Sequence, residues 1–198
     1  MYLAKPYPEI PVPMKDFDTR IQVKCLRKVL ETITDPRRRQ ILITTIEHAD
    51  AEGSGRYEAL MATCSKKHQS YRFWGSGNSS AHETPQSYAQ LEVYYKGLID
   101  SKIWMIHHDL DKVVVGDDEV VMDGVLHQLF PTALIEPYFR FKPDLSYRAY
   151  QLTKRLIITF FFDEDGLSCG EHAYSDGLIT AKDFTPVTDH YLPDLFKA

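Results

Sequence analysis

The chain has 198 residues, of which 43% are hydrophobic and 26% charged, and these are the proportions of an ordinary globular domain. Its net charge is −5, whereas a protein that neutralises phosphates usually carries a basic excess, so we expect no nucleic-acid partner. The most apolar run, residues 156–162, is too short to cross a bilayer, and the proline-rich start MYLAKPYPEIPVP lacks the apolar centre of a signal peptide. We therefore expect no membrane partner.

The three cysteines, Cys25, Cys64 and Cys169, lie far apart, and the sequence has no Cys-x-x-Cys pair. This spacing excludes zinc ribbons and thioredoxin-type redox sites. Three separated thiols are typical of a protein from a reducing compartment, so we expect a cytoplasmic location.

The first half of the chain has mainly helical spacing. Four prolines predict an extended arm over residues 1–15, and apolar residues three and four apart predict a helix over residues 16–33. Asp35 followed by Pro36 is typical of a helix start, and the helical pattern then continues until it weakens at Gly53. Further along we expect a short helix over 57–63, a strand over 69–74, a Gly- and Ser-rich loop, and a helix from Thr84-Pro85 to Leu98.

The second half reads mostly as strands, which form two hairpins. The predicted strands cover residues 103–115, 120–130, 147–162 and 167–175, while residues 131–145 and the tail from Lys182 are expected to be irregular. Helices followed by antiparallel strands predict an α+β fold. We divide the chain into an N-terminal arm and extra helix (1–34), one domain (35–180) and a C-terminal tail (181–198).

Charge predicts the register of the first hairpin. A two-residue turn at Asp117-Asp118 sets Gly116 opposite Glu119 and Lys112 opposite Asp123, whereas a three-residue turn would oppose two aspartates. Continued without interruption, the first register places His108 opposite His127. Both faces of this hairpin are apolar, so we expect helices on one face and a partner subunit or the extra N-terminal helix on the other.

The runs DLDKVVVGDDEVVMDG and RLIITFFFDEDGLSCGEHAYSDG, with the upstream EHADAEGSGRYEALMATCSKKHQSYRFWG, resemble the SnoaL-like group of the nuclear-transport-factor-two-like superfamily. The resemblance covers residues 35–178. It implies a curved, mostly antiparallel sheet wrapped around helices, with a deep pocket, and dimers formed through the outer sheet face. The superfamily includes ketosteroid isomerase, scytalone dehydratase, limonene epoxide hydrolase and polyketide cyclases. Because these enzymes share a pocket and no motif, the resemblance supplies no catalytic residues.

Histidines supply the candidates for acid/base chemistry. His107, His108 and Asp109 are consecutive, and an imidazole beside a carboxylate in a dry pocket suits proton transfer near neutral pH. His48 lies on the predicted long helix, with Glu52 four residues further on. For these residues the structural alternatives are solvated or inter-subunit polar groups and, for His48 and Glu52, a surface pair.

Aromatic and polar residues near these histidines are the candidates for substrate binding. Aromatic rings with polar handles suit a flat, partly apolar ligand, although core packing is the alternative for each ring. A buried Glu171 without a partner would have a raised pKa and could act as an acid, the alternative being a salt bridge. The residues proposed for binding are Tyr71, Trp74, Met105, His127, Glu171 and Tyr174. His82 lies in the Gly- and Ser-rich loop, the natural place for a lid.

Two further patterns have weaker implications. His107, Asp109 and His172 have the residue types of a non-haem iron triad, and that alternative requires them to converge on one point. Arg37-Arg38-Arg39 is the only basic run, and we interpret it as the solvated start of a helix.

These observations favour a cofactor-independent isomerase, dehydratase or cyclase that acts on a small apolar or aromatic molecule and forms a homodimer. A histidine (107, 108 or 48) would be the base, Asp109 would orient it, and Tyr71 or Tyr174 would donate to the developing oxyanion. The main alternative is a non-catalytic ligand-binding or assembly module of the same fold, which an entirely apolar pocket would favour.

Overall fold

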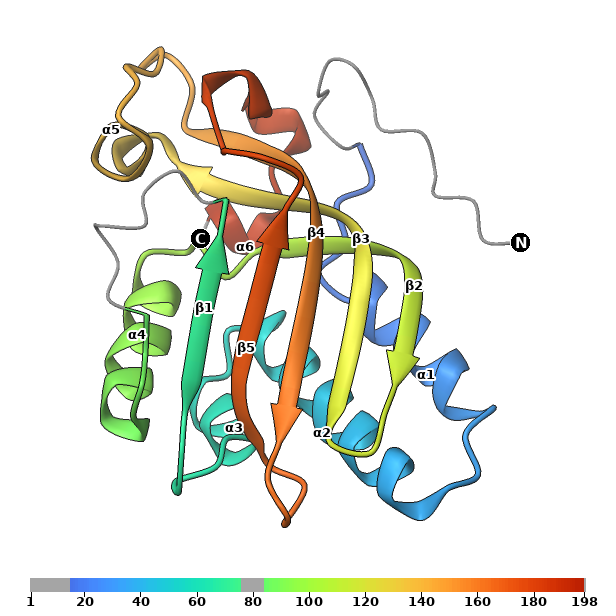
Figure 1. Cartoon of the computed structure of the whole chain (residues 1–198). Coiled ribbons are helices and arrows are strands. Elements are labelled where there is room, and N and C mark those ends of the chain that lie inside the picture. Colours follow the sequence, from blue (N-terminus) through green and yellow to red (C-terminus); the bar gives the residue numbers. More distant parts are fainter. Residues whose placement is uncertain (1–14, 76–83, 198) are drawn as a thin grey trace.

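The computed structural model describes residues 15–75 and 84–197. Helices dominate its first half and strands its second, which is the order that the sequence predicts (Figure 1). The helices are α1 (Ile21–Leu30), α2 (Pro36–Glu52), α3 (Tyr57–Ala62), α4 (Tyr88–Asp100), α5 (Thr132–Phe139) and α6 (Asp194–Lys197). The strands are β1 (Ser70–Trp74), β2 (Ile106–Val115), β3 (Glu119–Pro131), β4 (Ala149–Phe162), β5 (Ser168–Ser175) and β6 (Phe184–Val187).

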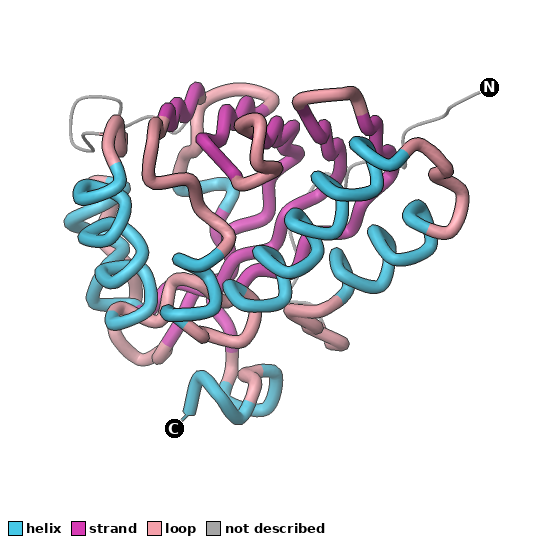
Figure 2. Tube along the Cα trace, turned by 90° about the horizontal axis from the view of Figure 1, so that it is seen from below, coloured by secondary structure: helices cyan, strands magenta, loops and turns pink. Residues whose placement is uncertain are grey.

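The strands form one curved sheet in the order β1-β5-β4-β3-β2, and β6 also pairs with β4. All pairings are antiparallel except that of β1 with β5. In Figure 1 helices α1, α2 and α3 lie behind the strands, and the perpendicular view in Figure 2 shows helices along one side of the sheet. We call the side that faces α2 the inner face and the opposite side the outer face. The fold is therefore α+β with a curved, mostly antiparallel sheet wrapped around helices, as the sequence predicts.

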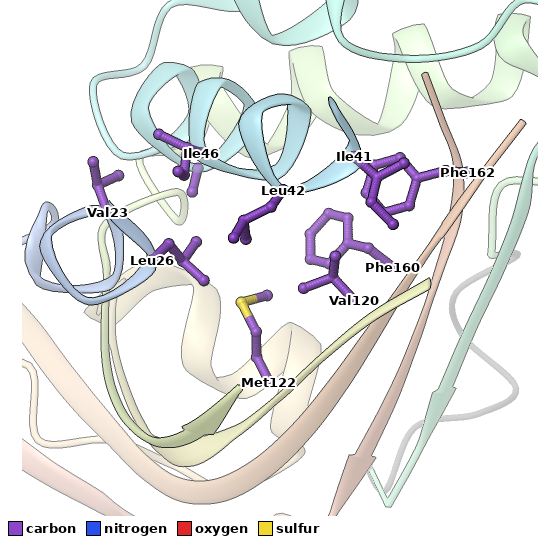
Figure 3. Close-up of a cluster of buried hydrophobic side chains, with 10 residues drawn as sticks. Val23, Leu26, Ile41, Leu42, Ile46, Val120, Met122, Phe160 and Phe162 are labelled. Atoms are coloured by element: carbon purple, nitrogen blue, oxygen red, sulfur yellow. The ribbon is translucent and has the colours of Figure 1, made fainter. Parts of the chain in front are cut away.

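Helix α2 begins where the sequence predicts. Asp35 is the N-cap, and its side chain accepts a hydrogen bond from the backbone N–H of Arg38 at 2.9 Å, while Pro36 fills the first helical position. The buried face of α2 packs with α1 onto the inner face of β3 and β4 (Figure 3). The side chains of this core that Figure 3 labels are Val23, Leu26, Ile41, Leu42, Ile46, Val120, Met122, Phe160 and Phe162. The extra N-terminal helix thus joins the inner layer and leaves the outer face open.

Arg37 and Arg38 stand at the solvent-exposed start of α2, as the sequence suggests, and their guanidinium groups also bind the hairpin turns. Arg37 Nη2 donates to the backbone oxygen of Asp163 at 2.6 Å and to Oδ1 of Asp118 at 3.1 Å, and Arg38 Nε donates to Oδ1 of Asp117 at 2.8 Å. Asp117 and Asp118 form the turn of one hairpin, and Asp163 begins the turn of the other. The start of α2 therefore ties both hairpin turns together.

The predicted register of the first hairpin is correct near the turn and wrong beyond it. Gly116 donates to the backbone of Glu119 at 2.8 Å, and Lys112 pairs with Asp123. Asp111 is then an extra residue, so that Leu110 pairs with Gly124 and His108 with Leu126, not with His127. A Cβ at position 124 would collide with the carbonyl oxygen of Asp109, which explains why glycine stands opposite the bulge.

Two segments that we expected to be irregular are ordered elements. Residues 132–139 form helix α5, which buries Ile135 against Phe130 and Tyr150. In the tail, β6 extends the sheet by pairing residues 184–187 with the start of β4. Prolines misled the prediction because Pro131 stands just before its helix, where proline costs nothing, and Pro186 lies on a short strand that pairs on one side.

Within the described residues, no helix is both long enough and apolar enough to cross a membrane.

Candidate functional site

A cavity of about 220 Å³ lies between the inner face of the sheet and helices α2 and α4. We call it the inner chamber. Most of its wall is apolar, with contributions from Leu98, Leu126, Ile158 and Phe160. The polar groups in this wall are few: Gln22, Glu52, Tyr95, His108, Gln128, Lys154 and Glu171 are the principal ones. An apolar cavity with a few converging polar groups is the usual form of a small-molecule site.

Tyr95 is the centre of a buried hydrogen-bond network at one side of the inner chamber. Its hydroxyl donates to Oε1 of Glu171 at 2.8 Å and lies 3.0 Å from both the Tyr71 hydroxyl and Nε2 of His48. On the far side of the ring, Nδ1 of His48 lies 2.8 Å from the Thr63 hydroxyl, which itself donates to the backbone oxygen of Leu60. Thr63 therefore accepts, and Nδ1 carries a proton.

The same network favours a fully protonated His48. Because Tyr95 gives its only proton to Glu171, it accepts from Tyr71 and from Nε2 of His48, which then also carries a proton. Burial by itself lowers the pKa of His48, but the neighbouring Cys64 sulfur and the Glu171 carboxylate, whose Oε1 is 3.5 Å from Nε2, raise it to about 10. His48 is 1% exposed at its side chain and does not line the chamber, so it acts on a ligand only through Tyr95 and Glu171.

Glu52 is the carboxyl group of the chamber whose proton affinity best suits proton transfer. It ends α2, one turn after His48, and no residue among 15–75 and 84–197 hydrogen-bonds to its carboxyl group. Burial and the nearby Glu171 carboxylate raise the pKa of Glu52 to about 7, against a smaller opposing effect of His48. Near neutral pH, Glu52 is thus present both as acid and as base.

His108 presents a neutral imidazole to the chamber. Its side chain is fully buried, and neither ring nitrogen has a hydrogen-bond partner in the described part of the chain. Burial lowers the pKa of His108 to about 4. A buried polar group without a partner costs about 1–3 kcal/mol. A ligand atom that hydrogen-bonds to His108 would remove that cost.

A second cavity of about 580 Å³ shares part of its wall with the first, including Phe73, Tyr94, Leu98 and Gln128. We call it the outer chamber. Its remaining wall combines the rings of Phe130, Tyr138 and Phe139 with aliphatic residues of α4 and the following loop and with the polar residues Arg72, Thr84 and Ser101. Together the chambers form a site with a polar inner end and an apolar outer end.

The structure brings four of the predicted site residues together and sets others apart. His108 and Glu171 line the inner chamber, His48 and Tyr71 lie behind its wall in the Tyr95 network, and Trp74 is among the residues that line both chambers. His107, Asp109, His127 and Tyr174 lie on the outer face, because the bulge at Asp111 turns His108 inward and Tyr174 alternates with Ala173, which lines the chamber. Met105 is buried in a separate cluster around Leu129 and Ala149. Asp109 therefore does not orient a histidine inside the chamber.

The metal alternative fails for geometric reasons. His107 and Asp109 are on β2 at one end of the strand order, whereas His172 is on β5, with β3 and β4 between them. In the described ranges, no group of three or more His, Cys, Asp or Glu side chains could hold a metal ion. His82 lies outside the described residues.

Sequence reasoning missed Glu52 and Tyr95 as site residues. Glu52 is four residues after His48, and this spacing does place both side chains on one face of a helix. Tyr95 lies inside the helix that the sequence predicts up to Leu98, and only the meeting of α2, α4 and β5 shows what its hydroxyl does.

Comparisons with known proteins support the fold. The structure resembles a protein described as a SnoaL-like polyketide cyclase from Shewanella putrefaciens, with a TM-score of 0.54 at 9% identity, over 87% of this chain and 93% of that one. It also resembles Δ5-3-ketosteroid isomerase from Mycobacterium sp., with a TM-score of 0.51 at 16% identity, over 75% of this chain and 98% of that one. A third similar structure, described as a SnoaL-like polyketide cyclase from Jannaschia sp., has a TM-score of 0.53 at 13% identity, over 73% of this chain and 90% of that one.

No protein-family profile matches the sequence. No curated protein matches it either. The chain thus has the cone-shaped α+β fold of the SnoaL-like and nuclear-transport-factor-two-like proteins, and its chemistry has to be argued from its own residues.

Proposed function

We propose that this protein is a cofactor-independent enzyme that isomerises, dehydrates or cyclises a small apolar or aromatic molecule by acid/base catalysis. The observation that carries this proposal is that Glu52 and His108 line the same, mostly apolar chamber. The pKa of Glu52 is raised to about 7, and His108 is neutral, with no hydrogen-bond partner for its ring nitrogens among the described residues. A general acid or base works best when its pKa is close to the working pH, and such groups contribute about 10²–10⁴-fold to a rate.

The proposed roles follow from the protonation states. Ionised Glu52 takes a proton from the carbon next to a carbonyl, and the neutral imidazole of His108 donates an N–H to the oxyanion that develops on that carbonyl. Glu52, now protonated, returns the same proton to another carbon, so that a double bond moves and no external reagent is consumed. Glu171, Tyr95 and His48 form a fixed polar network beside Glu52, in which the Glu171 carboxylate helps to raise the pKa of Glu52.

The charges of the site favour a neutral substrate. Glu52 and Glu171 face the inner chamber, and the positive charge of His48 lies behind them, while Lys154 at the wall is already paired with Asp176 and Asp183 at 3.1 and 3.3 Å. An anionic ligand would meet like charge in a place where water screens little. The outer chamber adds a large apolar volume, so we propose a neutral ketone, aldehyde or alcohol with an extended apolar or aromatic body.

The test is isomerisation of cyclohex-3-enone and larger β,γ-unsaturated ketones to their conjugated isomers, followed by ultraviolet absorbance. We expect turnover by the wild-type protein, a loss of about 10²-fold or more in Glu52→Gln, and no change in Glu47→Gln, an exposed glutamate on the same helix. Wild-type turnover that Glu52→Gln leaves intact would contradict the role of Glu52. Binding of the ketones without any turnover would support the non-catalytic binding module instead.

The assembly is part of the proposal. Trp74 and Tyr174 stack on the outer face with ring centroids 4.4 Å apart, and each remains 44% exposed. Ile157 and Val114 are exposed hydrophobic residues on the same face. An open apolar sheet face of this kind supports a homodimer that covers it with its own copy. Cys25, Cys64 and Cys169 all lie in the described part of the chain and form no disulfide bond there, which is consistent with the cytoplasmic location that we propose.

A further inference from the structure

The segment that leads into helix α1 reaches the inner chamber although it precedes residues 35–178, over which the sequence resembles SnoaL-like proteins. Thr19 and Gln22 line the chamber together with Glu52 and Gly53 at the end of α2. Helix α1 contacts both α2 and β2, and β2 is the last strand in the sheet order. The segment therefore stands at the side of the site where the sheet ends.

Two contacts fix this segment on the chamber side. The Thr19 hydroxyl donates to the backbone oxygen of Gly53 at 2.7 Å, and Gln22 Nε2 lies 3.3 Å from Sδ of Met122 on β3. A Cβ at position 53 would stand 2.7 Å from the Thr19 backbone oxygen, so the approach of the two segments requires glycine there. Since Gly53 follows Glu52 directly, the segment closes the space around that carboxyl group.

A second pair of contacts fixes the segment on the opposite face of β2. The backbone N–H of Asp18 donates to Nδ1 of His107 at 2.9 Å, and the Phe17 ring lies 5.8 Å from the His107 ring. His107 is 5% exposed, and its neighbour His108 points the other way, into the chamber. The segment thus contacts the end of α2 and β3 on the chamber side and the edge strand β2 on its other face, at His107.

We propose that residues 17–22 form a wall of the ligand site, with Thr19 and Gln22 as specificity-determining residues and His107 as the positioning residue that latches this wall to β2. The proposal rests on the proposed function only in taking the inner chamber as the ligand site. Without the latch, the chamber would open to water beside Glu52. His107 thereby has a structural part in the site although it touches no ligand.

Trp104 reports on the closure of this wall. It lines the inner chamber, is 7% exposed and packs against Gly55 just after the segment's contact at Gly53. Trp74 is the other tryptophan of the chain and is 44% exposed, so a Trp74→Phe background leaves Trp104 as the single emitter. Quenching of its fluorescence by acrylamide then measures how far the chamber admits a small polar molecule.

In that background we expect the quenching constant of Trp104 to rise by about twofold or more in His107→Ala and in Phe17→Ala, because local opening of the wall exposes the ring. His107→Asn supplies a side-chain oxygen that can accept from Asp18 N–H, and we expect it to restore protection. His68→Ala, which removes an exposed histidine elsewhere, is the matched control and should change nothing.

Equal quenching in His107→Ala, Phe17→Ala and the control would overturn the proposal. If His107→Ala does not fold, as circular dichroism would show, Phe17→Ala still decides the question. The readout needs no substrate, so a failure of the ketone assay would count against the proposed chemistry and leave this test unaffected. A lost latch should also widen the range of ketones bound, and an unchanged range in an opened variant would contradict the specificity role of Thr19 and Gln22.

Discussion

The hydroxyl of Tyr95 on α4 donates to Oε1 of Glu171 on β5 at 2.8 Å, and this bond joins a helix to the sheet at the edge of the inner chamber. The same oxygen of Glu171 lies 3.5 Å from Nε2 of His48 on α2. Three elements that are remote in sequence thus share one buried carboxylate. The stability of this corner of the fold and the proton affinity of the site depend on the same few atoms.

Removing the Tyr95 hydroxyl should destabilise the protein. Tyr95→Phe leaves the buried Glu171 carboxylate without its donor and Nε2 of His48 without its nearest acceptor. A hydrogen bond to a charged group contributes about 1.5–3 kcal/mol, so we expect a loss of that size in the free energy of unfolding, measured with urea. Tyr94→Phe is the control, because its hydroxyl has no hydrogen bond to a described residue. Equal effects of the two variants would contradict the network.

The activity of the proposed enzyme should depend on the ionisation of Glu52. Because the carboxylate is the base, kcat/KM for a β,γ-unsaturated ketone should rise with pH and level off above a midpoint near the pKa of Glu52, which is about 7. Tyr95→Phe should shift this midpoint, because it removes the hydroxyl that donates to Glu171, the carboxylate that helps to raise the pKa of Glu52. A profile that stays flat between about pH 5 and 9 would exclude Glu52 as the base.

The stability of the fold should be greatest near neutral pH. Burial lowers the pKa of His108 and of His127 to about 4, so both stay neutral in the folded state and their contribution is lost as the pH falls from their ordinary 6.5 toward 4. Glu52, whose pKa is raised to about 7, holds one extra proton in the folded state and so offsets the proton that one histidine binds in the unfolded state. The pKa of His48 is raised to about 10, so its contribution is lost as the pH rises from 6.5 toward 10.

Between about pH 6 and 5 the unfolded state binds at least one proton more than the folded state, two on His108 and His127 less one held on Glu52, and the lowered pKa values of His107 and His172 add to this difference. The free energy of unfolding should therefore fall on acidification below about pH 6, with a slope that approaches at least about 1.4 kcal/mol per pH unit near pH 5. His108→Gln, which cannot titrate, should flatten this acid side. Urea titrations at a series of pH values measure both profiles, and identical slopes would show that His108 is not buried and neutral.

A neutral ligand should bind to the inner chamber more tightly than an anionic ligand of similar shape. The carboxylates of Glu52 and Glu171 face the inner chamber, so 2-naphthol should bind at least about tenfold more tightly than 2-naphthoate near pH 7, a difference of about 1.4 kcal/mol. Isothermal titration calorimetry measures both affinities. Glu52→Gln should narrow the difference, and tighter binding of the carboxylate by the wild-type protein would contradict the assignment of a neutral substrate.

The outer face should carry the dimer contact. Light scattering after size-exclusion chromatography should give the mass of two chains for the wild-type protein, and Tyr174→Glu with Val114→Glu should shift it toward one, because like charges would be buried at the interface. Val93→Glu is the control, as Val93 is 75% exposed on helix α4. A wild-type monomer, or a dimer that tolerates both outer-face charges, would contradict the proposed dimer contact.

Local signals in the sequence predicted much of the fold. Asp35-Pro36 marks the start of α2 because the cap and the fixed backbone angle of proline act within four residues, and the hairpin turn follows from the charges at Lys112 and Asp123. The pairing of β1 with β5 and of β6 with β4 depends on residues far apart, and no local pattern encodes it.

The site was predictable only in part for the same reason. His48, His108 and Glu171 could be named one by one as residues with useful chemistry. Which of them meet depends on the crossing of α2, α4 and β5, and the importance of Glu52 arises from burial beside another carboxylate. Asp109 and His127 have the right chemistry on the wrong face.

The bulge at Asp111 determines which side chains of β2 face the inner chamber. With an uninterrupted register from the turn, Asp109 would pair with Leu126 and His107 with Gln128, and those two positions of β3 line the inner chamber. The chamber would then hold an imidazole and a carboxylate two residues apart, and His108 would face outward. A single inserted residue, accommodated by the glycine at position 124, therefore decides which of two adjacent histidines meets the ligand. Loss or gain of one codon here would exchange the reactive groups of the site while leaving the composition of the strand almost untouched.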